Sequence, residues 1–131
     1  MHLLPSLSWA YWCVLIAALL PYMSSYIAKA GAFGLGDNEK PREWGARQAG
    51  WRARAYASQS NGFEGLPFFI GAVIIAHQLG AAQSQIDSLA AAYVVLRLFY
   101  IAFYIAGIGN ARSAVWALAF LVNIAILFAG R

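Results

Sequence analysis

The chain has 131 residues, of which 62% are hydrophobic and 11% are charged, and its net charge is +4. A soluble chain of this size has about 25% charged residues and cannot bury so much apolar surface. The composition therefore excludes an ordinary water-soluble domain and a disordered chain, and the single cysteine excludes a disulfide scaffold. We expect one domain, residues 1–131, of an integral membrane protein.

Four apolar segments follow one another along the chain, each near the roughly 20 residues that a membrane-spanning helix needs. They are residues 9–28, 55–79, 88–107 and 112–129. The only charged side chains in them are Glu64 in the second segment, Arg97 in the third and Arg112 at the start of the fourth. The sequence therefore predicts an all-α protein whose four spans form a four-helix bundle.

Basic residues are concentrated in the connection between the first and second segments. It holds Lys29, Lys40, Arg42, Arg47, Arg52 and Arg54, mixed with the acidic residues Asp37, Glu39 and Glu43. The next connection has no Lys or Arg, and Arg112 follows the third segment. Because cytoplasmic connections carry the excess of Lys and Arg, we expect both termini on the outer side of the membrane. The mixture of both charges does not favour a nucleic-acid partner.

One face of the second segment carries polar side chains into the membrane. With Arg54 at its cytoplasmic end, Asn61 lies about 10 Å and Glu64 about 15 Å deep, because a helix rises about 1.5 Å per residue. The spacing i, i+7, i+10 places the three residues on one helical face. An ionisable group at such a depth is unfavourable in lipid, which makes it a candidate for a functional site.

The third segment runs in the opposite direction and carries a matching polar face. Tyr104 lies about 5 Å, Tyr100 about 10 Å and Arg97 about 15 Å from its cytoplasmic end. Arg97 and Glu64 therefore reach the same depth with opposite charges, and Arg112 begins the fourth segment at the same end. Because arginines outnumber acidic residues there, we expect an anionic, water-soluble ligand that enters from the cytoplasm.

Each of these residues also has a purely structural interpretation. Glu64 and Arg97 could pair only to join two helices, and the tyrosines could belong to the aromatic belt at the membrane surface. The arginines at the helix ends could be anchors alone. Asn123, in the fourth segment, is expected to form an interhelical hydrogen bond. No acidic residue, cysteine or second histidine stands at ligand spacing from His77, so we expect no metal site.

Three short motifs occur in order along the segments. They are Arg54-Ala55 with Asn61-x-x-Glu64-x-x-Pro67, then Arg97-x-x-Tyr100-x-x-x-Tyr104, and then Arg112-Ser113. In this order they resemble the MAPEG family, the membrane-associated proteins in eicosanoid and glutathione metabolism. The resemblance covers most of the chain, and the basic connection is similar to the cytoplasmic loop of bacterial members, among them microsomal glutathione transferase-like proteins.

The resemblance implies a homotrimer surrounded by membrane lipid. With the distribution of Lys and Arg described above, we expect it in a bacterial inner membrane with both termini in the periplasm. It also implies glutathione as a co-substrate, bound between subunits on the cytoplasmic side. By motif, the residues that would hold glutathione are Arg54, Asn61, Glu64, Arg97, Tyr100 and Tyr104. Arg112, with Ser113 beside it, would stabilise the thiolate as a catalytic group. The implied activity is that of a transferase or peroxidase acting on lipophilic electrophiles.

Two positions depart from better-characterised enzymes of that family. Those enzymes often have an arginine one turn before the asparagine, where this chain has Ala57. Some have a tyrosine directly after the glutamate, where this chain has Gly65. One cation and one hydroxyl are therefore missing. The alternatives are a non-catalytic member that serves as a membrane subunit or scaffold, and a binder of small anions or lipid headgroups.

Overall fold

The computed structural model of the chain describes residues 6–130, and every regular element in that part is a helix. The elements in order are α1 (Trp9–Lys29), the 3-10 helix η1 (Leu35–Glu39), α2 (Pro41–Ala46), α3 (Gly50–Gln78), α4 (Gln83–Ala106) and α5 (Gly109–Leu127). The prediction of an all-α fold is confirmed for these residues. The predicted domain also includes residues 1–5 and 131, which lie outside the described part.

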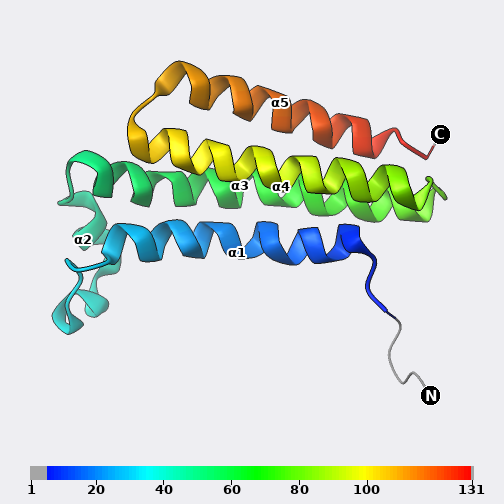
Figure 1. Ribbon diagram of the computed structural model, residues 1–131. Helices are drawn as coiled ribbons and strands as arrows, with labels where there is room; N and C mark the ends of the chain where they lie inside the picture. The colour runs from blue at the N-terminus through cyan, green and yellow to red at the C-terminus, as the bar shows by residue number, and fades with distance from the viewer. Residues whose placement is uncertain (1–5, 131) are drawn as a thin grey trace.

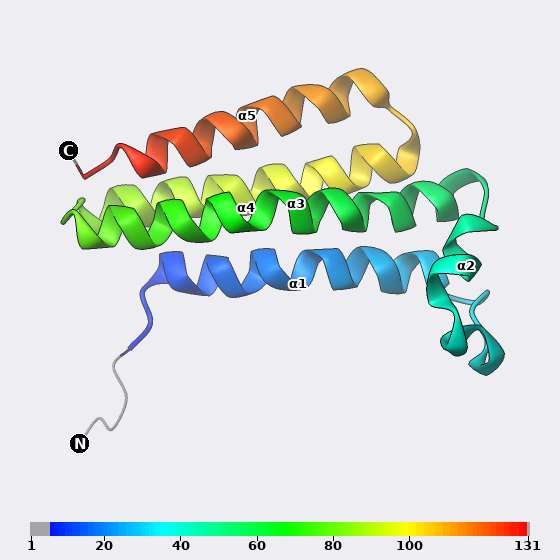
Figure 2. The same ribbon diagram turned by 180° about the vertical axis from the view of Figure 1, so that it is seen from behind.

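The four long helices α1, α3, α4 and α5 run side by side along one direction (Figure 1). The pair α3 and α4 lies in the middle, with α1 packed on one side and α5 on the other, and the reverse view shows the same order (Figure 2). Within residues 6–130, α1 and α5 do not contact each other. The cross-section is therefore flattened, and both outer helices turn a broad face away from the molecule.

The connections alternate between the two ends of the helices. The connection that holds η1 and α2 lies at the same end as the turn between α4 and α5, and the turn between α3 and α4 lies at the other (Figure 1). Gly107 follows α4 with φ +78°. This left-handed conformation suits glycine and commonly ends a helix. The basic connection and the residue Arg112 are thus near the same end.

Three of the helices, α1, α4 and α5, are long and apolar enough to cross a membrane. They overlap the first, third and fourth predicted spans. The second predicted span, 55–79, lies in α3, a helix of 29 residues that is not among these three in the described part. A polar stretch in the middle of α3 lowers its hydropathy, because Gln59, Ser60, Asn61 and Glu64 follow one another closely.

The apolar core occupies the half of the molecule nearer the α3–α4 turn. Phe69 of α3 stacks on Tyr93 of α4 with ring centroids 4.0 Å apart. Ile86 and Ile126 belong to the same cluster and are completely buried. The long helices carry their buried arginine and most of their polar side chains in the other half, so a polar site forms there.

The helices α1 and α3 approach closely where Pro21 meets Gly62. A Cβ atom added to Gly62 would lie 2.8 Å from Cγ of Pro21, which is closer than packed atoms come. Pro21 lies inside α1 and donates no backbone hydrogen bond. A proline inside a membrane helix is tolerated because neighbouring helices can satisfy the freed backbone groups. The absence of a side chain at Gly62 therefore sets the distance between these two helices.

Two arginines at the start of α3 bind the ends of two other helices. Arg52 donates from Nη1 to the carbonyl oxygens of Ala28 and Ala30 at the end of α1, at 2.9 and 2.6 Å. Arg54 donates from Nε to the carbonyl oxygen of Ile105 near the end of α4, at 2.9 Å. Positive charge is favourable at a helix C-terminus, where the last carbonyl groups lack helical partners. These hydrogen bonds join α3 to α1 and to α4 where the basic connection ends.

Candidate functional site

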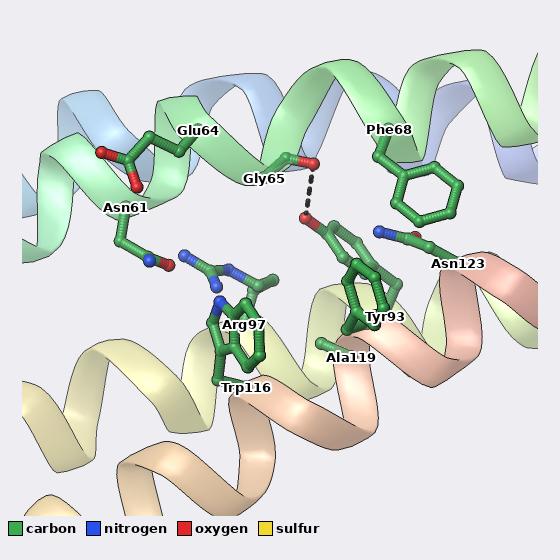
Figure 3. Close-up of a pocket in the computed structure, with 10 residues that line it drawn as sticks. Asn61, Glu64, Gly65, Phe68, Tyr93, Arg97, Trp116, Ala119 and Asn123 are labelled. Carbon is green, nitrogen blue, oxygen red and sulfur yellow. Dashed lines mark hydrogen bonds between the residues drawn. The ribbon is translucent and has the colours of Figure 1, made fainter.

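A cavity of about 200 Å³ lies between α3, α4 and α5 (Figure 3). Its wall consists of Asn61, Glu64, Gly65 and Phe68 from α3, Tyr93 and Arg97 from α4, and Trp116, Ala119, Phe120 and Asn123 from α5. The structure therefore brings three predicted site residues into one wall: Asn61, Glu64 and Arg97. Glu64 and Arg97 were expected together because they reach the same depth on neighbouring helices, and Asn61 because it shares a helical face with Glu64.

Arg97 is the cation of the cavity wall, and only 5% of it is exposed. Its guanidinium points toward the side chain of Asn61 (Figure 3). Within the described residues, Nη2 of Arg97 and Oδ1 of Asn61 have no hydrogen-bond partner. Glu64 is exposed at the margin, and the ion pairs in residues 6–130 do not include one between Glu64 and Arg97. The buried cation thus has no anionic partner among the described residues.

Arg97 also begins a row of side chains that leads toward the α4–α5 turn. Its Cζ atom lies 4.2 Å from the centroid of the Tyr100 ring. The rings of Tyr100 and Tyr104 meet edge to face with centroids 5.6 Å apart. The Cζ atom of Arg112 lies 4.6 Å from the centroid of the Tyr104 ring. Because cations are attracted to the faces of aromatic rings, this row holds four predicted site residues together, with a cation at each end.

The sequence model of the MAPEG family matches residues 9–130, nearly the whole chain. The chain belongs to the MAPEG family. Searches of the curated proteins and of the solved structures gave no match. Family membership and the three apolar helices together make the chain an integral membrane protein of the glutathione and eicosanoid metabolism family.

The two other predicted site residues of this MAPEG chain, Arg54 and Ser113, lie outside the cavity wall. Arg54 is partly buried, and its Nε is bound to the carbonyl oxygen of Ile105, close to Gly107. Ser113 is exposed in the first turns of α5. Arg54 therefore holds the end of α4, and its two terminal nitrogens are the part of the side chain that remains for a ligand.

The motifs of the MAPEG family did not indicate the wall that α5 contributes. Trp116, Ala119 and Asn123 follow Arg112 at i+4, i+7 and i+11, which is one helical face. This spacing is visible in the sequence and could have placed them beside the site. Asn123 was expected to form an interhelical hydrogen bond. It also lines the cavity, where its Oδ1 has no partner among the described residues.

Tyr93 is a further cavity residue that the motifs did not indicate. Its hydroxyl donates to the carbonyl oxygen of Gly65 at 3.4 Å (Figure 3). A Cβ atom added to Gly65 would lie 3.3 Å from the same hydroxyl oxygen. The hydroxyl therefore fills the space beside Gly65, the position where some MAPEG enzymes carry a tyrosine. Tyr93 lies one turn before Arg97 on the same face of α4, and this spacing in the sequence could have indicated it as a cavity residue.

Proposed function

We propose that the protein is a membrane-bound transferase or peroxidase that uses glutathione on lipophilic electrophiles. The observation that carries this proposal is Arg97, a buried arginine without an anionic partner among residues 6–130. An unpaired buried charge is strongly unfavourable, so the site calls for an anionic ligand. Glutathione has two carboxylates, and a guanidinium group can bind a carboxylate through two parallel hydrogen bonds.

The proposed contacts follow the charges of glutathione. Nη2 of Arg97, which has no partner in the described chain, donates to one carboxylate, and Oδ1 of Asn61 accepts from an N–H group of the tripeptide. Glu64 is exposed at the cavity margin and takes the ammonium group. The terminal nitrogens of Arg54 bind the second carboxylate, while its Nε keeps its bond to Ile105.

The proposed chemistry takes place at the glutathione sulfur. Arg112, held over the Tyr104 ring, stabilises the thiolate with Ser113 beside it. Tyr100 and Tyr104 offer hydroxyl groups and ring faces along the tripeptide. A free thiol has a pKa of about 8.5, which a neighbouring cation lowers. In the transferase reaction the sulfur forms a bond to an electrophilic carbon, and the leaving group departs with the electron pair of the bond that breaks.

This chain lacks a tyrosine hydroxyl at the position of Gly65 and an arginine at the position of Ala57. The hydroxyl has a substitute among the described residues, whereas the arginine has none. The hydroxyl of Tyr93 lies beside Gly65 and supplies an oxygen there. Ala57 has an exposed side chain on α3, and Arg97 is the one cation among the described residues of the cavity wall. Ala57 is the observation that favours the second candidate function, a non-catalytic membrane subunit.

The proposal includes a homotrimer in which neighbouring subunits complete the cavity. In the single subunit, α3 exposes a stripe of residues spaced i, i+3, i+7 and i+10: Ala57, Ser60, Glu64 and Pro67. Lipid does not accommodate the carboxylate of Glu64, so protein must cover this stripe. The cavity of about 200 Å³ is also smaller than the roughly 300–1,000 Å³ of most ligand pockets. A partner subunit would enlarge it and would let α3 cross the membrane as the fourth span of a four-helix bundle.

The proposed location is a bacterial inner membrane, with both termini in the periplasm. The connection that holds η1 and α2 carries Lys40, Arg42 and Arg47, and it lies at the same end as the α4–α5 turn (Figure 1). By the positive-inside rule this end faces the cytoplasm. Glutathione then reaches the row of arginines and tyrosines from the side on which it is dissolved.

Titration calorimetry with glutathione tests the proposal on purified protein in detergent. The wild type should bind in the micromolar to low-millimolar range, and Arg97→Leu should weaken binding about tenfold or more, because a charged hydrogen bond is lost. Arg97→Lys keeps the charge and should bind better than Arg97→Leu. Arg47→Leu, which removes an exposed arginine paired with Asp37, is the matched control and should bind like the wild type. If the wild type does not bind glutathione, the non-catalytic subunit is the better assignment.

A further inference from the structure

The connection between α1 and α3 is held together by its own side chains. Trp44 of α2 is only 2% exposed, and its ring meets that of Phe33 edge to face with centroids 5.3 Å apart. In η1, one carboxylate oxygen of Asp37 accepts from the backbone N–H of Gly34 at 2.9 Å, and the other pairs with Arg47 at 3.2 Å. These contacts fix the conformation of η1 and its direction relative to α2.

This ordered connection presents an apolar side chain at its tip. Leu35 begins η1 and is 97% exposed, more than any other large apolar side chain of the described residues. Within residues 6–130, α2 is the only helix that η1 contacts. A Cβ atom added to the neighbouring Gly36 would meet nothing within 4 Å. A single exposed leucine is ordinary on a surface in water, so its place relative to the membrane decides its meaning.

The tip lies at the level where the hydrocarbon layer ends. The 21 residues of α1 rise about 30 Å, close to the thickness of that layer. Tyr26, in the last turn of α1, is 75% exposed, as is common for aromatic residues at a membrane surface. At this end, η1 extends sideways past α1, on the side away from α3 and α4 (Figure 1, Figure 2). The connection therefore overhangs the lipid beside α1.

The charges of the connection suit the same neighbour. Basic residues outnumber acidic ones there, and ion pairs with acidic side chains occupy Lys40 and Arg47. Arg42 is exposed between them and has no ion pair within the described residues. Basic segments next to a membrane span are attracted to anionic lipid headgroups. An apolar tip close to a free cation matches the two layers of a phospholipid surface.

We propose that η1 rests on the membrane surface beside α1, with Leu35 inserted among the lipid chains and Arg42 at the anionic headgroups. Asp37 is the positioning residue, because its two bonds hold the tip in this direction. The phospholipid thereby anchors the connection that leads into α3. Burial of the leucine in lipid removes its apolar surface from water, which is favourable. The inference does not involve glutathione and is independent of the proposed function.

The accessibility of nitroxide spin labels tests this inference on the full chain in nanodiscs of phosphatidylcholine and phosphatidylglycerol. Oxygen concentrates among lipid chains, whereas a nickel chelate stays in water. In a Cys13→Ala background, the label at Leu35→Cys should be reached mainly by oxygen. Val95→Cys, on the exposed face of the apolar helix α4, is the lipid reference. Ala49→Cys, exposed between α2 and α3, is the water reference and should show the reverse preference.

A second set of variants leaves the label off the leucine itself. Residues three apart in a 3-10 helix share a face, so a label at Asn38→Cys stands beside Leu35. Leu35→Glu should shift this label from oxygen to the nickel chelate, because a carboxylate is unfavourable in lipid. Ala46→Glu adds the same charge at an exposed position of α2 and should leave the label unchanged. Arg42→Gln should weaken the preference for oxygen in the anionic nanodiscs.

A label at residue 35 that prefers the nickel chelate overturns the inference, because the tip then lies in water. A label that neither reagent reaches also overturns it, because protein then covers Leu35. An Asn38 label that does not respond to Leu35→Glu contradicts insertion of the leucine. Glutathione is absent from all these measurements, so a failure of the proposed function leaves the result readable.

Discussion

At the scale of single residues, the two cations at the ends of the tyrosine row have different surroundings. Arg97 is buried and its Nη2 has no partner within the described chain, whereas Arg112 is partly exposed in the first turn of α5. A buried guanidinium suits a fixed anion such as a carboxylate. A cation at a helix N-terminus adds the positive end of the helix dipole to its own charge and favours an anion that must be formed, such as a thiolate. In the proposed function, the row thus separates binding of glutathione at Arg97 from formation of the thiolate at Arg112.

We therefore predict that Arg112→Leu leaves glutathione binding nearly unchanged and removes most turnover with an aryl halide. A close positive charge lowers the pKa of a thiol by about one to three units, from about 8.5. Thiolate is present above the pKa, so the lowered value gives activity near neutral pH. Without Arg112 the rising limb of the pH–rate profile should move to higher pH. Difference spectra should also lose the ultraviolet absorbance of bound thiolate.

Arg112→Lys is the informative second variant, because lysine keeps a charge but places it differently. It should shift the pH–rate profile less than Arg112→Leu does. Arg47→Leu removes an exposed arginine far from the row and should leave the profile unchanged. If both variants of Arg112 keep the wild-type profile, Arg112 only anchors α5 at the membrane surface.

At the scale of helices, the fold depends on the close contact between α1 and α3. We predict that Gly62→Ala lowers the free energy of unfolding by about 1–3 kcal/mol, because the added methyl group overlaps the rigid ring of Pro21. Thermal melting in detergent measures the effect. Gly71→Ala is the control in the same helix, where the added Cβ meets no atom within 4 Å in the subunit. It should melt at the wild-type temperature or above, because alanine favours a helix by up to about 1 kcal/mol over glycine. Equal melting of the two variants would contradict the packing argument.

Helix positions and depths could be predicted from the sequence, because long apolar runs are visible in it and the rise per residue is fixed. Asn61, Glu64 and Arg97 were expected at neighbouring depths, and they line one cavity. The helices η1 and α2 were not predicted. They are short and depend on contacts made by distant residues, such as the bond from Nε1 of Trp44 to the carbonyl oxygen of Ala32 at 3.3 Å.

The rotation of each helix about its axis could not be predicted in the same way. When most sides of a helix are apolar, hydropathy does not tell which side faces a neighbour. For this reason the motifs did not reveal that Trp116 and Asn123 of α5 face the cavity. Depth alone also could not show that Glu64 lies at the margin and makes no ion pair with Arg97 within the described chain.

At the scale of the whole molecule, the flattened subunit leaves α3 with one side uncovered. We predict a homotrimer with a protein mass in detergent of about three times the 14.2 kDa of one subunit, measured by light scattering. Ser60→Trp places a large ring on the exposed stripe of α3 and should break the assembly. Val95→Trp does the same on the exposed face of α4, an apolar helix, and should leave the mass unchanged. A stable wild-type monomer would refute a pocket shared between subunits.

The alternating connections lead to a prediction of orientation. Alkaline phosphatase is active only outside the cytoplasm, so a fusion after Arg131 should be active in a bacterial membrane. A fusion after Gln48, in the basic connection, should be inactive, because its Lys and Arg residues keep that segment inside. The reverse pattern would place the proposed site on the periplasmic side, away from cytoplasmic glutathione.

Arg52 and Arg54 stand two residues apart, yet their contacts close chain separations of 24 and 51 residues. A chain that inserts during synthesis, N-terminal part first, can form the contact of Arg52 with α1 as soon as α3 begins. Arg54 can form its contact only after α4 has been synthesised, because its partner Ile105 lies near the end of that helix. The start of α3 is therefore completed in two stages during biogenesis. A chain that ends before α4 would therefore lack the contact between Arg54 and Ile105, and the end of the bundle that holds the proposed site would be incomplete.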